Sequence, residues 1–372
     1  MGVSDRLAAW SLQRVHVLAV EVPGWWTTRA ALEARVVACG WAVATSPADA
    51  DVLVVCGDAG AQLGERVELV WDQLPSPRAR AAVNAPMDVG AALDRVAAEL
   101  ADVRAQRSSA ASRMATSSSD AMDQGDMEGM DDGDMEGMDH GDMEGMDHGD
   151  MDMAPSGIPL ASGAPDRDGL EMDVLQVPLG PVLAHWPAGL VLRCTLAGDI
   201  VTGADVEVLR GAGLPPEAGP APATLRAARC LDAASSVLAL AGWTDASAQA
   251  QQLRDRLLAD PAPDMPTVVP AIEALRNRVA RSLALRWMLR GVRPSSGALA
   301  AGPDVHGRLL GLLDDARGHL NGTADATTQH PTDVLEALPD AVTGLDIAAV
   351  RLVVAALDVR TDRLPAEAVL HG

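Results

Sequence analysis

The chain has 372 residues and 48% of them are hydrophobic, so it is long enough for two domains with substantial cores. Its net charge of −23 argues against nucleic-acid binding, which needs a basic face. No apolar run approaches the roughly 20 residues that span a bilayer. The first residues also lack the basic and apolar regions of a secretory signal. We therefore expect a cytoplasmic protein without a transmembrane segment.

The chain contains no Lys, Phe or Tyr, so its core must be built from Ala, Val and Leu, with Trp as the only aromatic residue. Four cysteines are scattered along it without a CxxC pair: Cys39, Cys56, Cys194 and Cys230. Metal sites usually draw their cysteine ligands from close pairs. Free, buried thiols are therefore the expectation for all four.

Strands and helices alternate over roughly residues 14–107. Continuous apolar runs predict strands at Val15–Val22, Trp41–Thr45, Val52–Cys56 and, more weakly, Ala79–Val83. Helical spacing of apolar residues predicts helices at Thr27–Ala38, between the third strand and Pro75, and at Val89–Val103. Such alternation indicates a parallel sheet covered on both sides. We assign residues 1–107 to a flavodoxin-like α/β domain.

Residues 108–154 differ in composition from the rest of the chain. A polar lead-in is followed by the repeat GDMEGMDD at Gly125–Asp132, and then by GDMEGMDH at Gly133–His140 and at Gly141–His148. Residues 120–152 contain fourteen acidic residues and no Lys or Arg, so the rest of the chain has a net charge of −9. High charge and frequent Gly favour disorder. We therefore expect a disordered, acidic, Met-rich linker here.

Residues 155–372 are expected to form an α+β domain with an N-terminal β-hairpin and a mostly helical remainder. In the hairpin, Leu192, Cys194 and Leu196 should face one way and Arg193 and Thr195 the other, with Gly198–Asp199 as the turn. Apolar stripes predict the helices Ala223–Ala241, Ser247–Leu258, Val268–Leu289, His306–His319 and Leu345–Leu357.

The strand Val52–Cys56, the helix after it and the string WDQLPSP at Trp71–Pro77 resemble one known family. This is the PSST-type subunit of respiratory complex I, with the related small subunits of [NiFe] hydrogenases. The resemblance implies a [4Fe–4S] cluster held by cysteine thiolates, two of them adjacent after the first strand. Here Trp25 and Trp26 stand at that place, and Asn84-Ala85-Pro86 stands where a further cysteine would follow the fourth strand. We therefore expect no cluster cofactor.

The segment LGPVLAHWPAGLVLR at Leu179–Arg193 resembles the N-terminal hairpin of complex I's large quinone-site subunit, a relative of the hydrogenase large subunit. The family motif is Gly-Pro-x-His-Pro-Ala-x-His-Gly followed by Leu-Arg, and the spacing here is two residues longer. The resemblance places His185 where the quinone-site histidines would be. The alternative is an ordinary loop histidine. The hydrogenase CxxC is missing from Arg210–Pro216, so a [NiFe] centre is excluded.

The repeat is the other candidate for chemistry. Methionine thioethers suit Cu(I), whereas imidazole and carboxylate groups suit Cu(II) and other divalent ions. The composition resembles metal-gathering tracts of copper-handling proteins, and the candidate ligands are Met127, Met130, Met135, Met138, His140, Met143, Met146 and His148. The alternative is a solvated acidic tether that grew by duplication.

The chain lacks a Walker loop, a G-x-S-x-G elbow and an H-E-x-x-H helix. The two resemblances together imply a fused, cluster-less pair of complex I-type or hydrogenase-type subunits that dock on each other within one chain. The first hypothesis is a structural or assembly component of an oxidoreductase complex, not a self-sufficient enzyme. Its partners would be the other subunits, and it would lie peripheral to the inner face of the cell membrane. The alternatives are metal binding through the repeat and a working quinone oxidoreductase subunit.

Overall fold

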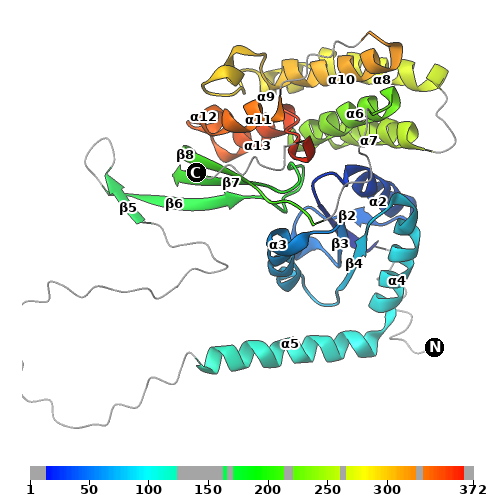
Figure 1. The fold of residues 1–372 in the computed structure, drawn as a ribbon, viewed down its shortest axis with the longest axis vertical. Helices are drawn as coiled ribbons and strands as arrows, with labels where there is room; N and C mark the ends of the chain where they lie inside the picture. The colour runs from blue at the N-terminus through cyan, green and yellow to red at the C-terminus, as the bar shows by residue number, and fades with distance from the viewer. Residues whose placement is uncertain are drawn as a thin grey trace, which may run out of the picture.

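The computed structural model describes residues 14–123, 162–165, 171–212, 221–259, 265–323 and 330–363. It forms an N-terminal domain around a parallel sheet and a C-terminal domain in which a stack of helices lies beside an antiparallel sheet (Figure 1). Among the described residues, no helix combines the length and the apolar composition that crossing a membrane requires.

The N-terminal sheet has four parallel strands in the order β2-β1-β3-β4, which confirms the predicted parallel sheet. The strands are β1 (His16–Glu21), β2 (Ala42–Val43), β3 (Val52–Cys56) and β4 (Ala79–Val83). The main helices are α2 (Trp26–Ala38), α3 (Gly60–Gln73) and α4 (Val89–Ala101), with short 3₁₀ turns η2 (Pro47–Asp49) and η3 (Pro86–Asp88). Helices α2 and α4 contact each other on one side of the sheet, and α3 lies on the other (Figure 1).

The predicted linker begins later than its composition indicates. Helix α5 (Val103–Asp123) covers the first residues of the predicted linker, and the expectation of disorder is wrong for Ser108–Ala115. This stretch contains neither Gly nor Pro and is rich in Ala, which has the highest helix propensity. Asp102 also caps the helix, because its carboxylate accepts from the backbone N–H groups of Arg104 and Ala105 at 3.1 and 3.0 Å. Residues 124–154 of the predicted linker lie outside the described residues.

The C-terminal sheet is an antiparallel meander in the order β5-β6-β7-β8. Its strands are β5 (Ser162–Pro165), β6 (Glu171–Leu179), β7 (Leu190–Ala197) and β8 (Ile200–Val208). The predicted hairpin is confirmed: β7 and β8 pair across Gly198, and Leu192, Cys194 and Leu196 are buried. Alternation along β7 therefore directs one face of the hairpin into the helical core.

The helices of the C-terminal domain pack around α6, which contacts α7, α10 and α13. They are α6 (Ala223–Leu240), α7 (Thr244–Leu258), α8 (Met265–Arg281), α9 (Leu283–Leu289), α10 (Val305–Asn321), α11 (Pro331–Glu336), α12 (Leu338–Val342) and α13 (Ile347–Ala356), with 3₁₀ turns η5 (Ala298–Ala301) and η6 (Thr361–Arg363). The single helix predicted over Val268–Leu289 is divided at Ser282. There the backbone becomes extended, and the Ser282 hydroxyl accepts from the N–H of Leu285 to start α9.

The two domains meet at the carboxyl ends of β1 and β3. The N–H of Ala212 donates to the carbonyl of Asp58, which follows β3, at 2.9 Å. Gly211 approaches so closely that a Cβ there would overlap Val22 and the Asp58 carbonyl. The domains therefore contact each other directly. They meet at the point where the strand order reverses, and doubly wound sheets bind their ligands outside this point.

Candidate functional site: the contact between the two domains

Two adjacent tryptophans fill the contact at the end of β1. Trp25 and Trp26 are each only 5% exposed. Trp25 belongs to the core of the N-terminal domain and packs on Gly57, where a Cβ would lie 2.7 Å from the indole. Trp26 belongs to the core of the C-terminal domain. The crevice in which a doubly wound sheet usually holds a ligand is thus occupied by two indoles.

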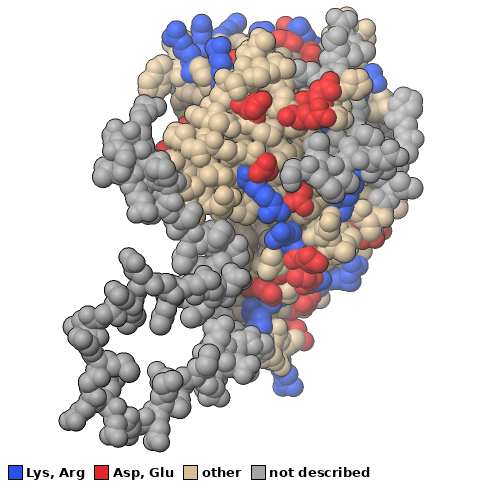
Figure 2. Space-filling model, turned by 60° about the vertical axis from the view of Figure 1, so that its left-hand side comes forward, with Lys and Arg blue, Asp and Glu red and all other residues tan. Residues whose placement is uncertain are grey.

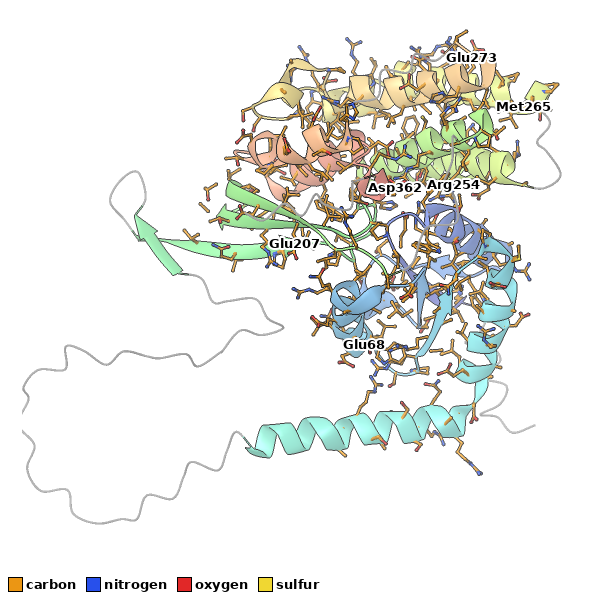
Figure 3. The ribbon with its side chains drawn as sticks, in the orientation of Figure 1. Glu68, Glu207, Arg254, Met265, Glu273 and Asp362 are labelled. Atoms are coloured by element: carbon orange, nitrogen blue, oxygen red, sulfur yellow. The ribbon has the colours of Figure 1, made fainter. Side chains whose placement is uncertain are left out.

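Beside the tryptophans, two arginines and two carboxylates form a closed ring across the contact. Arg29 of α2 donates to Glu33 of the same helix and to Asp232 of α6, both at 2.6 Å. Arg254 of α7 donates to the other oxygen of Glu33 at 2.7 Å and to the other oxygen of Asp232 at 2.6 Å. Arg254 is 1% exposed and lies at the boundary between α7 and the N-terminal domain (Figure 3). We call these four residues the charged ring.

The charged ring joins three helices from both domains. Arg29 and Glu33 lie four residues apart on α2, so they share one face of that helix. Each carboxylate contacts both guanidinium groups, and the ring contains two positive and two negative charges. Burial alone would raise the pKa values of Asp232 and Glu33, but Arg29 and Arg254 outweigh it and lower both. The two carboxylates are therefore ionised and serve to hold the arginines.

Two further carboxylates flank the ring. Glu21, at the end of β1, accepts from Nε of Arg29 at 2.5 Å. Burial raises the pKa of Glu21, and the nearby charges of Arg29 and Arg229 only partly oppose this. Asp255 accepts from Arg254 at 2.8 Å, and burial raises its pKa as well. Glu21 and Asp255 are the acids at this contact whose ionised forms are disfavoured by folding.

A second charged group covers the outer side of Trp26. The Arg229 guanidinium lies 5.3 Å from the centre of the Trp26 ring, a cation–π distance. Its Nε is 3.5 Å from a carboxylate oxygen of Asp358, which also faces Arg360 at 3.7 Å. Trp26 is therefore held between the helical core and an arginine that is itself paired.

A cavity of about 150 Å³ opens beside the charged ring. One wall contains Glu21, Arg29 and Glu33, another is the loop of residues 181–188, and α6 supplies Asp232 and Ser236. Three hydrogen bonds fix the position of this loop. Arg351 donates to the carbonyl of Ala184, Thr361 to that of Ala188, and Nε1 of Trp186 to that of Leu190, at 2.8–2.9 Å.

His185, the residue expected at a quinone-site position, lines this cavity. Its backbone is left-handed, with φ at 58°. Burial lowers the pKa of His185, and the positive charges of Arg29 and Arg351 lower it further against the opposing effect of Glu33. The imidazole is therefore neutral near pH 7. A quinone contact at His185 stays a prediction.

The residues at the expected cluster position do not fit a [4Fe–4S] cluster. Thiolates must approach one another at loop ends, but Trp25 and Trp26 stand there as buried indoles. Cys56, at the end of the neighbouring strand β3, is fully buried opposite Glu21. Burial, with the charge of Glu21, raises its pKa far above the ordinary value, so its thiol stays protonated.

The remaining cysteines and the repeat do not extend this site. Cys39 is exposed, so the expectation of a buried thiol is wrong for this residue. Cys194 is buried in the hairpin, and Cys230 lies on α6 with a pKa raised to about 12 by burial. Within the part of the chain that the structure describes, no group of three His, Cys, Asp or Glu residues is arranged to hold a metal ion. The candidate copper ligands Met127, Met130, Met135, Met138, His140, Met143, Met146 and His148 lie outside that part.

The charged ring was not predicted from the sequence. Asp232 follows Leu231 in the buried stripe of α6, and Arg254 follows Leu253 on the buried side of α7. A charge next to the apolar stripe of a predicted helix is the signal that could have identified both residues, because charged residues are rarely buried without a partner. Which partners they meet could not be read from spacing along the chain.

The raised pKa of Glu21 predicts how stability changes with pH. A carboxyl group whose pKa is higher in the folded than in the unfolded state stabilises the fold below its ordinary pKa, here 4.5. That contribution is lost as the pH rises through the higher folded value. Glu33 and Asp232 have lowered pKa values, so they stabilise the fold at pH values above their ordinary pKa values of 4.5 and 3.8. Their contribution to stability is lost as the pH falls below these values.

We therefore expect Glu21→Gln to reduce the fall in unfolding free energy between about pH 4.5 and 7. Glutamine keeps an oxygen that accepts from Arg29 and cannot ionise. The measurement is urea unfolding of both proteins across this pH range. Asp255 and Asp315 also have raised pKa values, but both proteins contain them. The difference in pH slope between the variant and the unaltered protein is therefore due to Glu21. Equal pH slopes for the two proteins would contradict the prediction.

Comparisons of the chain with protein-family models, with curated proteins and with solved structures found no match. What the contact between the domains does is therefore argued from its own residues.

Proposed function

We propose that this protein is a structural or assembly component of an oxidoreductase complex of the complex I or [NiFe]-hydrogenase type. In this proposal a small-subunit-like domain and a large-subunit-like domain are held together on one chain without a cluster between them. The observation that carries the proposal is the burial of Trp25 and Trp26 at the end of β1. They stand where the resemblance expects cluster ligands, and they join the cores of both domains.

The chemistry of the contact supports a holding role. Both oxygens of Glu33 and both oxygens of Asp232 are engaged by guanidinium groups, so neither carboxylate is free to move a proton. Cys56 lies next to the contact with a protonated thiol. A fused pair of this kind would present a fixed composite surface to the other subunits, which are the proposed partners.

The cavity at His185 favours a second candidate function, the binding of a small ring-shaped ligand such as a quinone head group. A neutral imidazole can accept a hydrogen bond from such a ligand or donate one to it. Apolar residues of the loop, among them Val182 and Leu183, line the same cavity. This candidate needs an electron donor from another subunit, because the residues at the contact do not fit a cluster.

The test is an anaerobic pull-down of the tagged full-length protein from its native host. We expect it to recover subunits of an oxidoreductase complex. The tagged chain, separated from its partners, should then contain no acid-labile sulfide. Iron and sulfide at about four of each per chain would overturn the proposal, because that is the content of a [4Fe–4S] cluster. Recovery of copper-handling proteins alone would overturn it in favour of metal binding through the repeat.

A further inference from the structure

Residues 274–303 form a basic segment in an otherwise acidic protein. They contain six arginines and no Asp or Glu, although the chain as a whole has 52 acidic and 29 basic residues. The six are Arg276, Arg278, Arg281, Arg286, Arg290 and Arg293. The segment covers the end of α8, all of α9 and the loop that leads to α10. Figure 2 shows arginine side chains gathered at the upper end of the molecule, the end that these helices occupy in Figure 1.

Helix α9 exposes three large apolar side chains within this segment. Leu283 is 78% exposed, Trp287 80% and Met288 52%. Leu283 and Trp287 lie four residues apart and therefore share one face of the helix. The helix is anchored by its other face, where Leu285 and Leu289 are buried in the core. The exposed residues do not hold α9 in place, so a different role must account for them.

The arginines around α9 are free to meet an anionic partner. Arg281, Arg286, Arg290 and Arg293 are exposed, and none of them forms an ion pair with any residue that the structure describes. Arg276, on α8, is instead paired with Asp314 at 3.1 Å. Four unpaired positive charges thus surround three exposed apolar side chains. We call these seven residues the basic apolar ridge.

We propose that the basic apolar ridge docks this protein on the surface of a membrane rich in anionic phospholipids. Tryptophan and leucine side chains favour the boundary between head groups and acyl chains, and arginines beside them pair with lipid phosphates. Leu283, Arg286, Trp287 and Met288 are all exposed on α9, so a lipid surface can reach the apolar and the basic side chains together. This inference does not depend on the proposed function.

The net charge of the protein does not prevent this docking. Charges separated by more than about 8 Å are largely screened at physiological ionic strength. An anionic surface therefore responds to the charges nearest to it, which on this face are the four arginines. Each arginine close to such a surface strengthens binding by about fivefold. The anionic surface would repel the acidic faces of the protein, so the molecule would approach it with the basic apolar ridge first.

The test is co-sedimentation of the full-length protein with vesicles. One set contains phosphatidylcholine alone, and the other contains equal parts of phosphatidylcholine and phosphatidylglycerol. We expect binding to the anionic vesicles only, and weaker binding at high salt. The double variant Arg286→Gln/Arg290→Gln should bind about 25-fold more weakly. Trp287→Ala should lose binding on the order of tenfold, because binding strength follows the apolar area inserted.

Matched controls are exposed residues of the N-terminal domain. They are the double variant Arg66→Gln/Arg95→Gln, and Met87→Ala, whose side chain is 87% exposed. These variants should bind like the unaltered protein, and the thermal unfolding of every variant confirms that it is folded. Absence of binding, equal binding to both kinds of vesicle, or an equal loss in the control variants would overturn the proposal.

Discussion

Replacing Asp232 with alanine is expected to lower the unfolding free energy by about 3–5 kcal/mol, the cost of breaking a buried ion pair by removing one partner. Asp232 accepts hydrogen bonds from Arg29 and Arg254, which belong to different domains. Without it, Glu33 is the one carboxylate left in the charged ring for two buried guanidinium groups, and Glu21 and Asp255 beside them are acids whose ionised forms burial disfavours. The measurement is urea unfolding at neutral pH, where the Asp232 carboxylate is ionised because its pKa is lowered.

The matched control is Asp314→Ala. Asp314 also lies on a helix of the C-terminal domain and pairs with an arginine, Arg276, at 3.1 Å, but its side chain is 39% exposed. Exposed pairs contribute about 0–1 kcal/mol, so this variant should be nearly as stable as the unaltered protein. A loss for Asp232→Ala no greater than that for Asp314→Ala would show that the charged ring does not hold the domains together.

The second large effect is expected from Trp26→Ala, which should lower the unfolding free energy by about 3–5 kcal/mol. Trp26 lies on a helix of the N-terminal domain and is buried in the core of the C-terminal domain. Its removal leaves a cavity between the domains and takes away the ring over which Arg229 lies. Thermal unfolding followed by circular dichroism measures the loss.

Trp287→Ala serves as the control for this substitution. The same side chain is removed from a position that is 80% exposed, so stability should change by less than about 0.5 kcal/mol. If the two alanine variants were equally stable, Trp26 would not join the two cores, and the proposed structural function would lose its main support.

The regular elements of the fold could be predicted where burial leaves a periodic pattern. The run VLVVC at Val52–Cys56 indicates a parallel strand because such strands are covered on both faces. Alternation in Leu190–Ala197 indicates a hairpin that is buried on one face. Local chemistry that interrupts a pattern was harder to predict. Ser282 divides one apolar helix into α8 and α9 because its hydroxyl caps a new helix in place of continuing the old one.

The sequence by itself determined the α/β alternation, the hairpin, the missing cluster ligands and the basic composition of residues 274–303, because each is a property of residues close together in the chain. Only the tertiary structure decided the contact between the domains. Arg29 and Glu33 on α2 show the spacing of an ordinary surface pair. Asp232 and Arg254 come from helices about 200 residues further on, and docking removes all four from water together. Burial of charge is a property of the folded chain, and no local pattern encodes which partners will neutralise it.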